Sequence, residues 1–185
     1  MNDEALYQLY MNGQEEAADE LVQRYGDALT LYIHGFLGDI SEAEDLMIEA
    51  FSLMFSKKRP IDGDGSFKGY LYRVARNLAY RYQSKAKIRF FSLEELNFEL
   101  SSEAMEETMF SGEERKKELY DAMAGLKEEY REALYLVYFE EMSYKEAAHV
   151  MRKTESQITK LVYRGKQSLK HKLEQEGFVY GDSEQ

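Results

Sequence analysis

The chain has 185 residues and a formal net charge of −11, enough for one ordinary domain or two small ones. It contains no cysteine, which excludes disulfide bonds, thiolate zinc sites and cysteine nucleophiles. The acidic N-terminus lacks the apolar stretch of a signal peptide, and no apolar run approaches the ~20 residues of a transmembrane span. We therefore expect a cytoplasmic protein with no membrane insertion.

Charge is distributed unevenly along the chain. Residues 1–56 carry a net charge of −11, whereas residues 57–91 contain ten basic and only two acidic residues. A second basic stretch, residues 152–172, has a net charge of +6. Because salt screens charges beyond ~10 Å, a local basic patch can attract phosphates even on an acidic chain. The net charge therefore does not exclude a nucleic-acid partner.

The first lobe has the periodicity of packed helices. Apolar residues recur every four positions from Ala17 to Leu37, which predicts one helix. Ser41 and Glu44 form a predicted capping box that begins the next helix, which ends near Ser56. Acidic residues line the outer side of this second helix, beside apolar ones. They could dock on a basic partner helix or simply form a solvated face.

A basic, glycine-rich loop, residues 57–65, leads to a third helix with Ser66 as its expected N-cap. Cations can follow a nucleic-acid backbone and aromatic rings can stack on unpaired bases, so this segment could contact single-stranded or melted nucleic acid. Alternatively, Phe67 and at least half of the other rings belong to the core. The interleaved basic and aromatic candidates include Lys57, Lys58, Arg59, Tyr70, Arg73, Arg76, Tyr80 and Arg81.

Residues 92–115 are rich in glutamate and serine and lack sustained periodicity, so we interpret them as an acidic linker between two lobes with separate cores. The second lobe, residues 116–185, contains two predicted capping boxes, Ser143–Glu146 and Thr154–Gln157. The two caps are 11 residues apart, the spacing of a helix-turn-helix. In that motif the N-terminal residues of the second helix face base edges, although a solvated helix face has the same pattern.

Catalysis and metal binding are not indicated. The three histidines, His34, His149 and His171, are far apart in the sequence and lack a metal-ligand pattern. Neither a nucleophile elbow nor a phosphate-binding loop motif is present. We therefore expect no enzyme activity, no catalytic residue, no metal and no cofactor.

Three segments, taken in order, resemble the bacterial sigma factors of the extracytoplasmic-function (ECF) group in the sigma-70 family. SFKGYLYRVARNLAYRY, residues 66–82, resembles the helix of that family that reads and melts the promoter −10 element. AEDLMIEAFSLMF, residues 43–55, is similar to its core-polymerase-binding helix. LKEEYREALYLVYFEEMSYKEAAHVM and the helix at 154–173 resemble its −35-binding domain.

The resemblance implies an all-α fold of two small helical domains, sigma region 2 (residues 1–91) and sigma region 4 (residues 116–185), joined by the linker 92–115. It implies three sites. Contacts to core polymerase, on the clamp of its β′ subunit, would come from Glu44, Asp45, Met47, Ile48, Glu49 and Ser52. Contacts to the −10 DNA would come from Lys57, Lys58, Arg59, Tyr70, Arg73, Arg76, Asn77, Tyr80 and Arg81. Contacts to the −35 DNA would come from Glu155, Ser156, Gln157, Thr159, Lys160, Tyr163, Arg164 and Lys166.

The implied partners are core RNA polymerase, promoter DNA and an anti-sigma factor, and the polymerase would do all of the chemistry. Arg152 and Lys153 stand where the family usually has glycine and an aliphatic residue in the helix-turn-helix. Two other functions also fit the pattern of helices. One is a helix-turn-helix regulator that binds duplex DNA without polymerase, and the other is an acidic helical adaptor whose patches bind protein.

Overall fold

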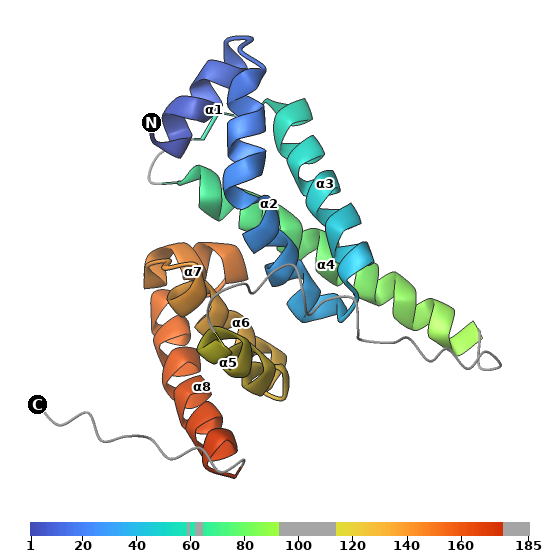
Figure 1. Cartoon of the computed structure of the whole chain (residues 1–185), viewed down its shortest axis with the longest axis vertical. Coiled ribbons are helices and arrows are strands. Elements are labelled where there is room, and N and C mark those ends of the chain that lie inside the picture. Colours follow the sequence, from blue (N-terminus) through green and yellow to red (C-terminus); the bar gives the residue numbers. More distant parts are fainter. Residues whose placement is uncertain (59, 62–64, 93–113, 176–185) are drawn as a thin grey trace, which may run out of the picture.

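The computed structural model describes residues 1–58, 60–61, 65–92 and 114–175, and every regular element in these ranges is helical (Figure 1). This confirms the all-α prediction. Arg59, most of the predicted linker and residues 176–185 lie outside the described residues. The N-terminal bundle comprises α1 (Asp3–Met11), α2 (Glu16–Leu37), α3 (Ile40–Lys57) and α4 (Phe67–Ser92). The C-terminal bundle comprises α5 (Glu114–Ala124), α6 (Glu128–Leu134), a π-helical turn (Tyr135–Phe139), α7 (Tyr144–Met151) and α8 (Glu155–Gln175).

The N-terminal bundle is built as its periodicity predicts. Leu21, Leu29 and Ile33 of α2 are fully buried, and so are Phe67 and Leu71 of α4. Ser66 caps α4, since its hydroxyl accepts a hydrogen bond from the backbone N–H of Gly69 at 3.0 Å. Burying these side chains contributes about 1.5–3 kcal/mol each, which is the main stabilisation of the bundle.

The predicted start of α3 was wrong by two residues. The N-cap is Asp39, whose carboxylate accepts a hydrogen bond from the N–H of Glu42 at 2.9 Å. Gly38 ends α2 in the left-handed conformation with φ 70°, a geometry that glycine adopts at little cost. The next residue is therefore extended and carries a short acceptor beside the free N–H groups, so Asp39 caps the helix before Ser41 is reached.

Both predicted capping boxes of the C-terminal bundle are present. The hydroxyl of Ser143 accepts from the N–H of Glu146 at 3.2 Å, and the Glu146 carboxylate accepts from the N–H of Ser143 at 2.9 Å. Thr154 and Gln157 exchange the same pair of bonds at 3.2 and 2.9 Å. Between α7 and α8 the chain turns at Arg152, which has φ 54°. The predicted helix-turn-helix therefore forms.

The π-helical turn between α6 and α7 changes which side chains face inward. The N–H of Glu140 donates to the carbonyl of Tyr135, five residues earlier, at 3.1 Å. Tyr135 and Leu136 are buried, whereas Tyr138 is 48% exposed. The spacing of inward-facing side chains in an α-helix does not hold where a turn contains one additional residue.

The two bundles share one apolar core instead of the separate cores expected from the sequence. The ring of Tyr32 in α2 lies 5.0 Å from that of Tyr72 in α4 and 5.8 Å from that of Tyr135 in the C-terminal bundle. Helix α4 also packs against α7 (Figure 1). The face of α4 that the sequence assigns to nucleic acid is thereby turned toward the C-terminal bundle.

Candidate nucleic-acid interface

Helix α8 presents an exposed, basic face. Its inner side is formed by Ile158, Val162 and Gly165, all buried. The ring of Tyr163 is 64% exposed. All eight predicted −35 residues are solvent-exposed: Glu155, Ser156, Gln157, Thr159, Lys160, Tyr163, Arg164 and Lys166.

Some of these side chains are already positioned by neighbours on the same surface. The Thr159 hydroxyl donates to the carbonyl of Glu155 at 2.9 Å. The Lys166 ammonium lies 4.8 Å from the ring centre of Tyr138, and a hydrogen bond to that residue raises the pKa of Lys166. The exposed ring of Tyr138 therefore extends the α8 face onto the π-helical turn.

The turn that orients α8 is held by side chains as well as by its backbone. Arg152 adopts the left-handed conformation, and its N–H donates to the carbonyl of Ala148. Lys153 forms an ion pair with Glu129 of α6 at 2.8 Å. These contacts hold Arg152 in a left-handed backbone conformation, which glycine would adopt at a lower energetic cost.

The outer face of α3 is acidic with an apolar centre. Ile48, a large aliphatic residue on this face, is 59% exposed. Glu44, Asp45, Glu49 and Ser52 around it are exposed, and Met47 is half-buried. An exposed aliphatic residue ringed by carboxylates fits a basic partner surface with an apolar centre.

The predicted −10 residues of α4 divide into two sets. Arg81 is exposed, whereas the polar groups between Tyr70 and Tyr80 are partly buried. The ring of Tyr70 lies 5.1 Å from that of His149, and Arg73 approaches both ring nitrogens of His149 at 3.4 Å. Asn77 is also partly buried.

The structure does not bring the two exposed lysines of the −10 set onto this α4 face. Lys57 and Lys58 close the C-terminal end of α3, where the Lys58 ammonium lies 5.4 Å from the ring centre of Tyr10. They therefore belong to the surface formed by α1 and α3. The nearby Gly-rich loop is described only at residues 57–58, 60–61 and 65.

The sequence did not predict an ion pair that joins the two bundles. The Arg76 Nε lies 2.6 Å from Glu132 Oε1, and the Glu132 side chain is 1% exposed. Tyr32 donates a hydrogen bond to the same carboxylate at 2.8 Å. Burial raises the pKa of Glu132, although Arg76 and Tyr32 act against that shift by stabilising the charged form. The one available signal was a glutamate directly before the buried pair Ala133–Leu134.

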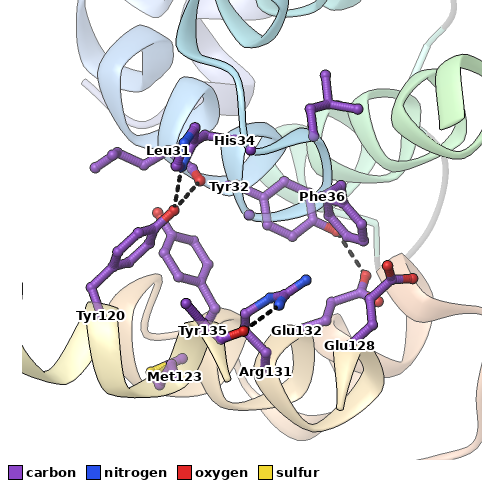
Figure 2. A pocket seen from close by; sticks show the side chains of 14 residues that line it. Leu31, Tyr32, His34, Phe36, Tyr120, Met123, Glu128, Arg131, Glu132 and Tyr135 are labelled. Atoms are coloured by element: carbon purple, nitrogen blue, oxygen red, sulfur yellow. Dashed lines mark hydrogen bonds between the residues drawn. The ribbon is translucent and has the colours of Figure 1, made fainter. Parts of the chain in front are cut away.

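A cavity of about 350 Å³ lies between the C-terminal end of α2 and the helices α5 and α6 (Figure 2). His34 and Tyr120 face each other across it, with His34 Nδ1 and the Tyr120 hydroxyl 2.9 Å apart. Glu132 and Arg131 line its floor. Within residues 1–58, 60–61, 65–92 and 114–175, no group of three or more potential metal ligands is present. In the same ranges, no helix is long and apolar enough to cross a membrane.

Two helical bundles, one carrying an exposed helix-turn-helix, define a DNA-binding protein, and comparison with known proteins gives its family. Residues 10–88 match the model of sigma-70 region 2, and residues 116–169 match that of sigma-70 region 4. The chain belongs to the ECF group of the sigma-70 family and is an RNA polymerase sigma factor.

Several relatives and solved structures are similar over most of their length. The ECF sigma factor SigM of Bacillus subtilis is 32% identical over 152 residues, covering 82% of this chain and 92% of SigM. The ECF sigma-E factor of Escherichia coli is 24% identical, covering 94% and 95%. The fold matches sigma factor RpoE of Bartonella quintana, solved with the anti-sigma factor NepR, with a TM-score of 0.68, 18% identity and coverage of 84% and 96%. It also matches CnrH, solved with the cytosolic domain of CnrY, with a TM-score of 0.65, 20% identity and coverage of 93% and 97%.

Proposed function

We propose that this sigma factor binds core RNA polymerase through α3, holds the melted −10 element with α4 and the loop before it, and reads the −35 duplex with α8. Residues 1–91 would form the first functional domain and residues 116–185 the second, joined by the linker 92–115. The observation that carries the proposal is the α8 surface, where every predicted −35 residue is exposed on a capped helix.

The α8 surface has the chemistry of a major-groove reader. The amide of Gln157 can pair with adenine, and Lys160 can pair with guanine or hold a phosphate. Arg164 lies one turn further along the helix and is suited to a phosphate contact. Phosphate contacts position the helix, and base-edge contacts from its first turn supply sequence preference.

The α3 surface has the chemistry of a docking site for the polymerase clamp. Ile48 would enter an apolar pocket, and Asp45 and Glu49 would face basic residues around it. Such an arrangement gives a desolvated centre and a charged rim, which favours rapid and specific association.

The α4 helix supplies cations and rings for separated DNA strands. Extruding a base from a duplex costs a few kcal/mol, which stacking on aromatic side chains offsets. Tyr70 and Tyr80 would stack on bases, Arg73 and Arg76 would neutralise phosphates, and Asn77 would make a polar contact. The polymerase would form all covalent bonds, so the chain itself has no catalytic residue. Its place of action is then the cytoplasm, where promoter DNA and polymerase are found together.

An anti-sigma factor is the proposed regulatory partner. The support is structural, because two proteins whose folds match this chain were solved with a partner: RpoE with the anti-sigma factor NepR, and CnrH with the cytosolic domain of CnrY. The exposed acidic and basic surfaces described above offer separate places for such a partner to bind.

Charge reversal on α3 tests the proposed function. Asp45→Lys with Glu49→Lys should reduce run-off transcription by purified core polymerase at least about tenfold, because like charges at a docking surface oppose association. The matched control, Asp19→Lys with Asp27→Lys, makes the same charge change at exposed positions of α2. Equal activity of the two double variants would remove the docking assignment, and a wild-type chain that supports no transcription from a promoter library would refute the function.

A further inference from the structure

The cavity between α2 and the helices α5 and α6 is lined by aromatic rings from both bundles (Figure 2). Tyr32 and Phe36 of α2 meet edge to face, with their ring centres 5.2 Å apart. Tyr120 and Tyr135 of the C-terminal bundle meet in the same way at 6.4 Å. Two aromatic pairs, one from each bundle, therefore border the same space, which suits a flat apolar ligand.

The acidic groups in the lining of the cavity already have hydrogen-bond donors. Glu132 is paired with Arg76 through both of its oxygens, at 2.6 and 3.4 Å. The two oxygens of Glu128 accept from the Tyr80 hydroxyl at 2.8 Å and from the Gln83 amide at 3.4 Å. A cationic ligand would have to compete with these donors for either carboxylate.

Arg131, in contrast, has donors to spare. Its guanidinium carries five N–H groups, and one of its nitrogens donates to the carbonyl of Ala124 at 3.2 Å. No carboxylate of the described residues forms an ion pair with it. A Cβ built at Gly35 would lie 3.9 Å from Arg131 Nε and 4.0 Å from the Tyr120 hydroxyl, so both groups border the same part of the cavity. The unused donors there call for an acceptor from a ligand.

The chemistry of the lining favours a carboxylate as that acceptor. Burial lowers the pKa of His34, and Arg131 lowers it further, so the histidine is neutral at neutral pH and adds no second positive charge. A guanidinium binds a carboxylate through two parallel hydrogen bonds. Because Glu128 and Glu132 also line the cavity, a singly charged head is repelled less than a doubly charged phosphate would be.

The size of the cavity limits the ligand to a small molecule. At the ~30 Å³ that a water molecule occupies in the liquid, 350 Å³ holds about a dozen non-hydrogen atoms. One fused pair of aromatic rings with a short acidic arm has that size. Clefts between domains, lined by apolar groups and a few convergent polar ones, are common ligand sites.

We propose that this cavity binds a small aromatic carboxylate, with the ring system against Phe36 and Tyr120 and the carboxylate on Arg131. The proposal does not rest on the proposed function, since the predicted contacts to DNA and polymerase include none of the cavity-lining residues. A ligand held by both walls binds only while the walls adjoin. Its concentration would therefore bias how the two bundles are arranged.

Indole-3-acetate is a suitable probe because the chain contains no tryptophan, so that indole fluorescence can be excited selectively. Fluorescence anisotropy with the full-length chain should give a dissociation constant of about 1 mM or lower, as ordinary ligand efficiency gives for a molecule of this size. Indole-3-acetamide keeps the shape of the probe but not its charge. It should bind about tenfold more weakly, because it loses the charge-assisted hydrogen bonds.

Two pairs of variants separate the role of charge from that of space. Arg131→Gln should bind the acid and the amide with about equal affinity, whereas Lys127→Gln, which removes a charge at the exposed N-cap of α6, should keep the preference for the acid. Gly35→Leu places a side chain in the cavity and should weaken binding of both probes at least about tenfold. Gly26→Leu makes the same change in α2 outside the cavity and should leave both affinities unchanged.

A further measurement shows whether the ligand joins the two walls. Dyes on cysteines introduced at Asp19 and Lys170, which are exposed in α2 and α8, report separation of the bundles by energy transfer. Since the native chain has no cysteine, labelling is specific. Saturating indole-3-acetate should raise the urea concentration at which energy transfer is half lost, because it binds only the form in which the walls adjoin. The shift should be smaller in Arg131→Gln.

Three results would overturn the inference. Absence of binding at about 10 mM, ten times the expected dissociation constant, would remove the site. Equal affinity of the wild type for the acid and the amide would refute the carboxylate as the recognised group. Unchanged affinity in Gly35→Leu would place the bound probe outside this cavity. Run-off transcription without the probe tests the proposed function separately, so failure of one leaves the other standing.

Discussion

Two glycines in helix interiors have opposite surroundings. A Cβ added at Gly165 of α8 would lie 3.1 Å from Leu134 and 3.4 Å from Tyr130, since α8 crosses α6 closely there. A Cβ added at Gly26 of α2 would meet no atom within 4 Å. A side chain at Gly165 would therefore have to displace Leu134, whereas glycine at position 26 only adds entropy to the unfolded chain.

Substitution at these glycines should change stability in opposite directions. Gly165→Leu should lower the free energy of unfolding by about 1–3 kcal/mol, because additional methylenes in a packed crossing force neighbours to move. Gly26→Ala should raise it by about 0.5–1 kcal/mol through helix propensity. Urea unfolding followed by circular dichroism gives both values, and a stable Gly165→Leu protein would contradict the close α6–α8 contact.

At the scale of elements, α8 combines phosphate contacts and base readout on one surface. Arg164→Ala should weaken binding to a duplex carrying a promoter recovered from the transcription library. The slope of log K against log salt should become shallower by about 0.9, as expected for one lost phosphate contact on B-DNA. Lys170→Ala, which removes a charge further along the same helix, is the control and should leave the slope closer to that of the wild type. An unchanged slope in Arg164→Ala would remove its phosphate role.

The end of α2 gives the contact between the bundles a dependence on pH. Burial lowers the pKa of His34, whose ring contacts the Tyr120 hydroxyl of α5, while Asp39 and the backbone of Gly38 oppose the shift and Arg131 adds to it. A histidine with a lowered pKa in the closed form contributes stability that is complete above its ordinary pKa of 6.5 and is lost as pH falls below that value.

Acidification from pH 7.5 to 6.0 should therefore favour separation of the bundles and lower the energy transfer between dyes in α2 and α8. His34→Gln should reduce this response, because glutamine does not titrate. Part of the pH response should remain in His34→Gln because of His149, whose pKa is also lowered by burial and by Arg73. The raised pKa of Glu132 has the opposite sign, because protonation of that carboxyl group favours the closed form as pH falls. A pH response of equal size in His34→Gln would contradict the role of this histidine.

At the scale of the molecule, the sequence predicted what depends on neighbours within one or two helical turns. The boxes at Ser143 and Thr154 follow from side chains three residues apart, and the α8 face follows from helical periodicity. Closure of the bundles depends on Tyr32 and Glu132, which are 100 positions apart, and on Arg76, 56 positions before Glu132. The local sequence pattern indicates that the polar side chain of Arg76 lies partly on the outer side of its helix. It does not show whether the guanidinium contacts a phosphate, water or a carboxylate of the same chain.

The widened turn at Tyr135–Phe139 has a consequence for how such proteins diverge. Each residue rotates an α-helix by about 100°, so the one additional residue in that turn sets the direction in which the chain leaves α6 toward the loop before α7. Loss of a single codon there would re-aim the helix-turn-helix while leaving each separate helix able to form. Insertions and deletions at this point of the gene are thus a short evolutionary route to a different orientation on promoters.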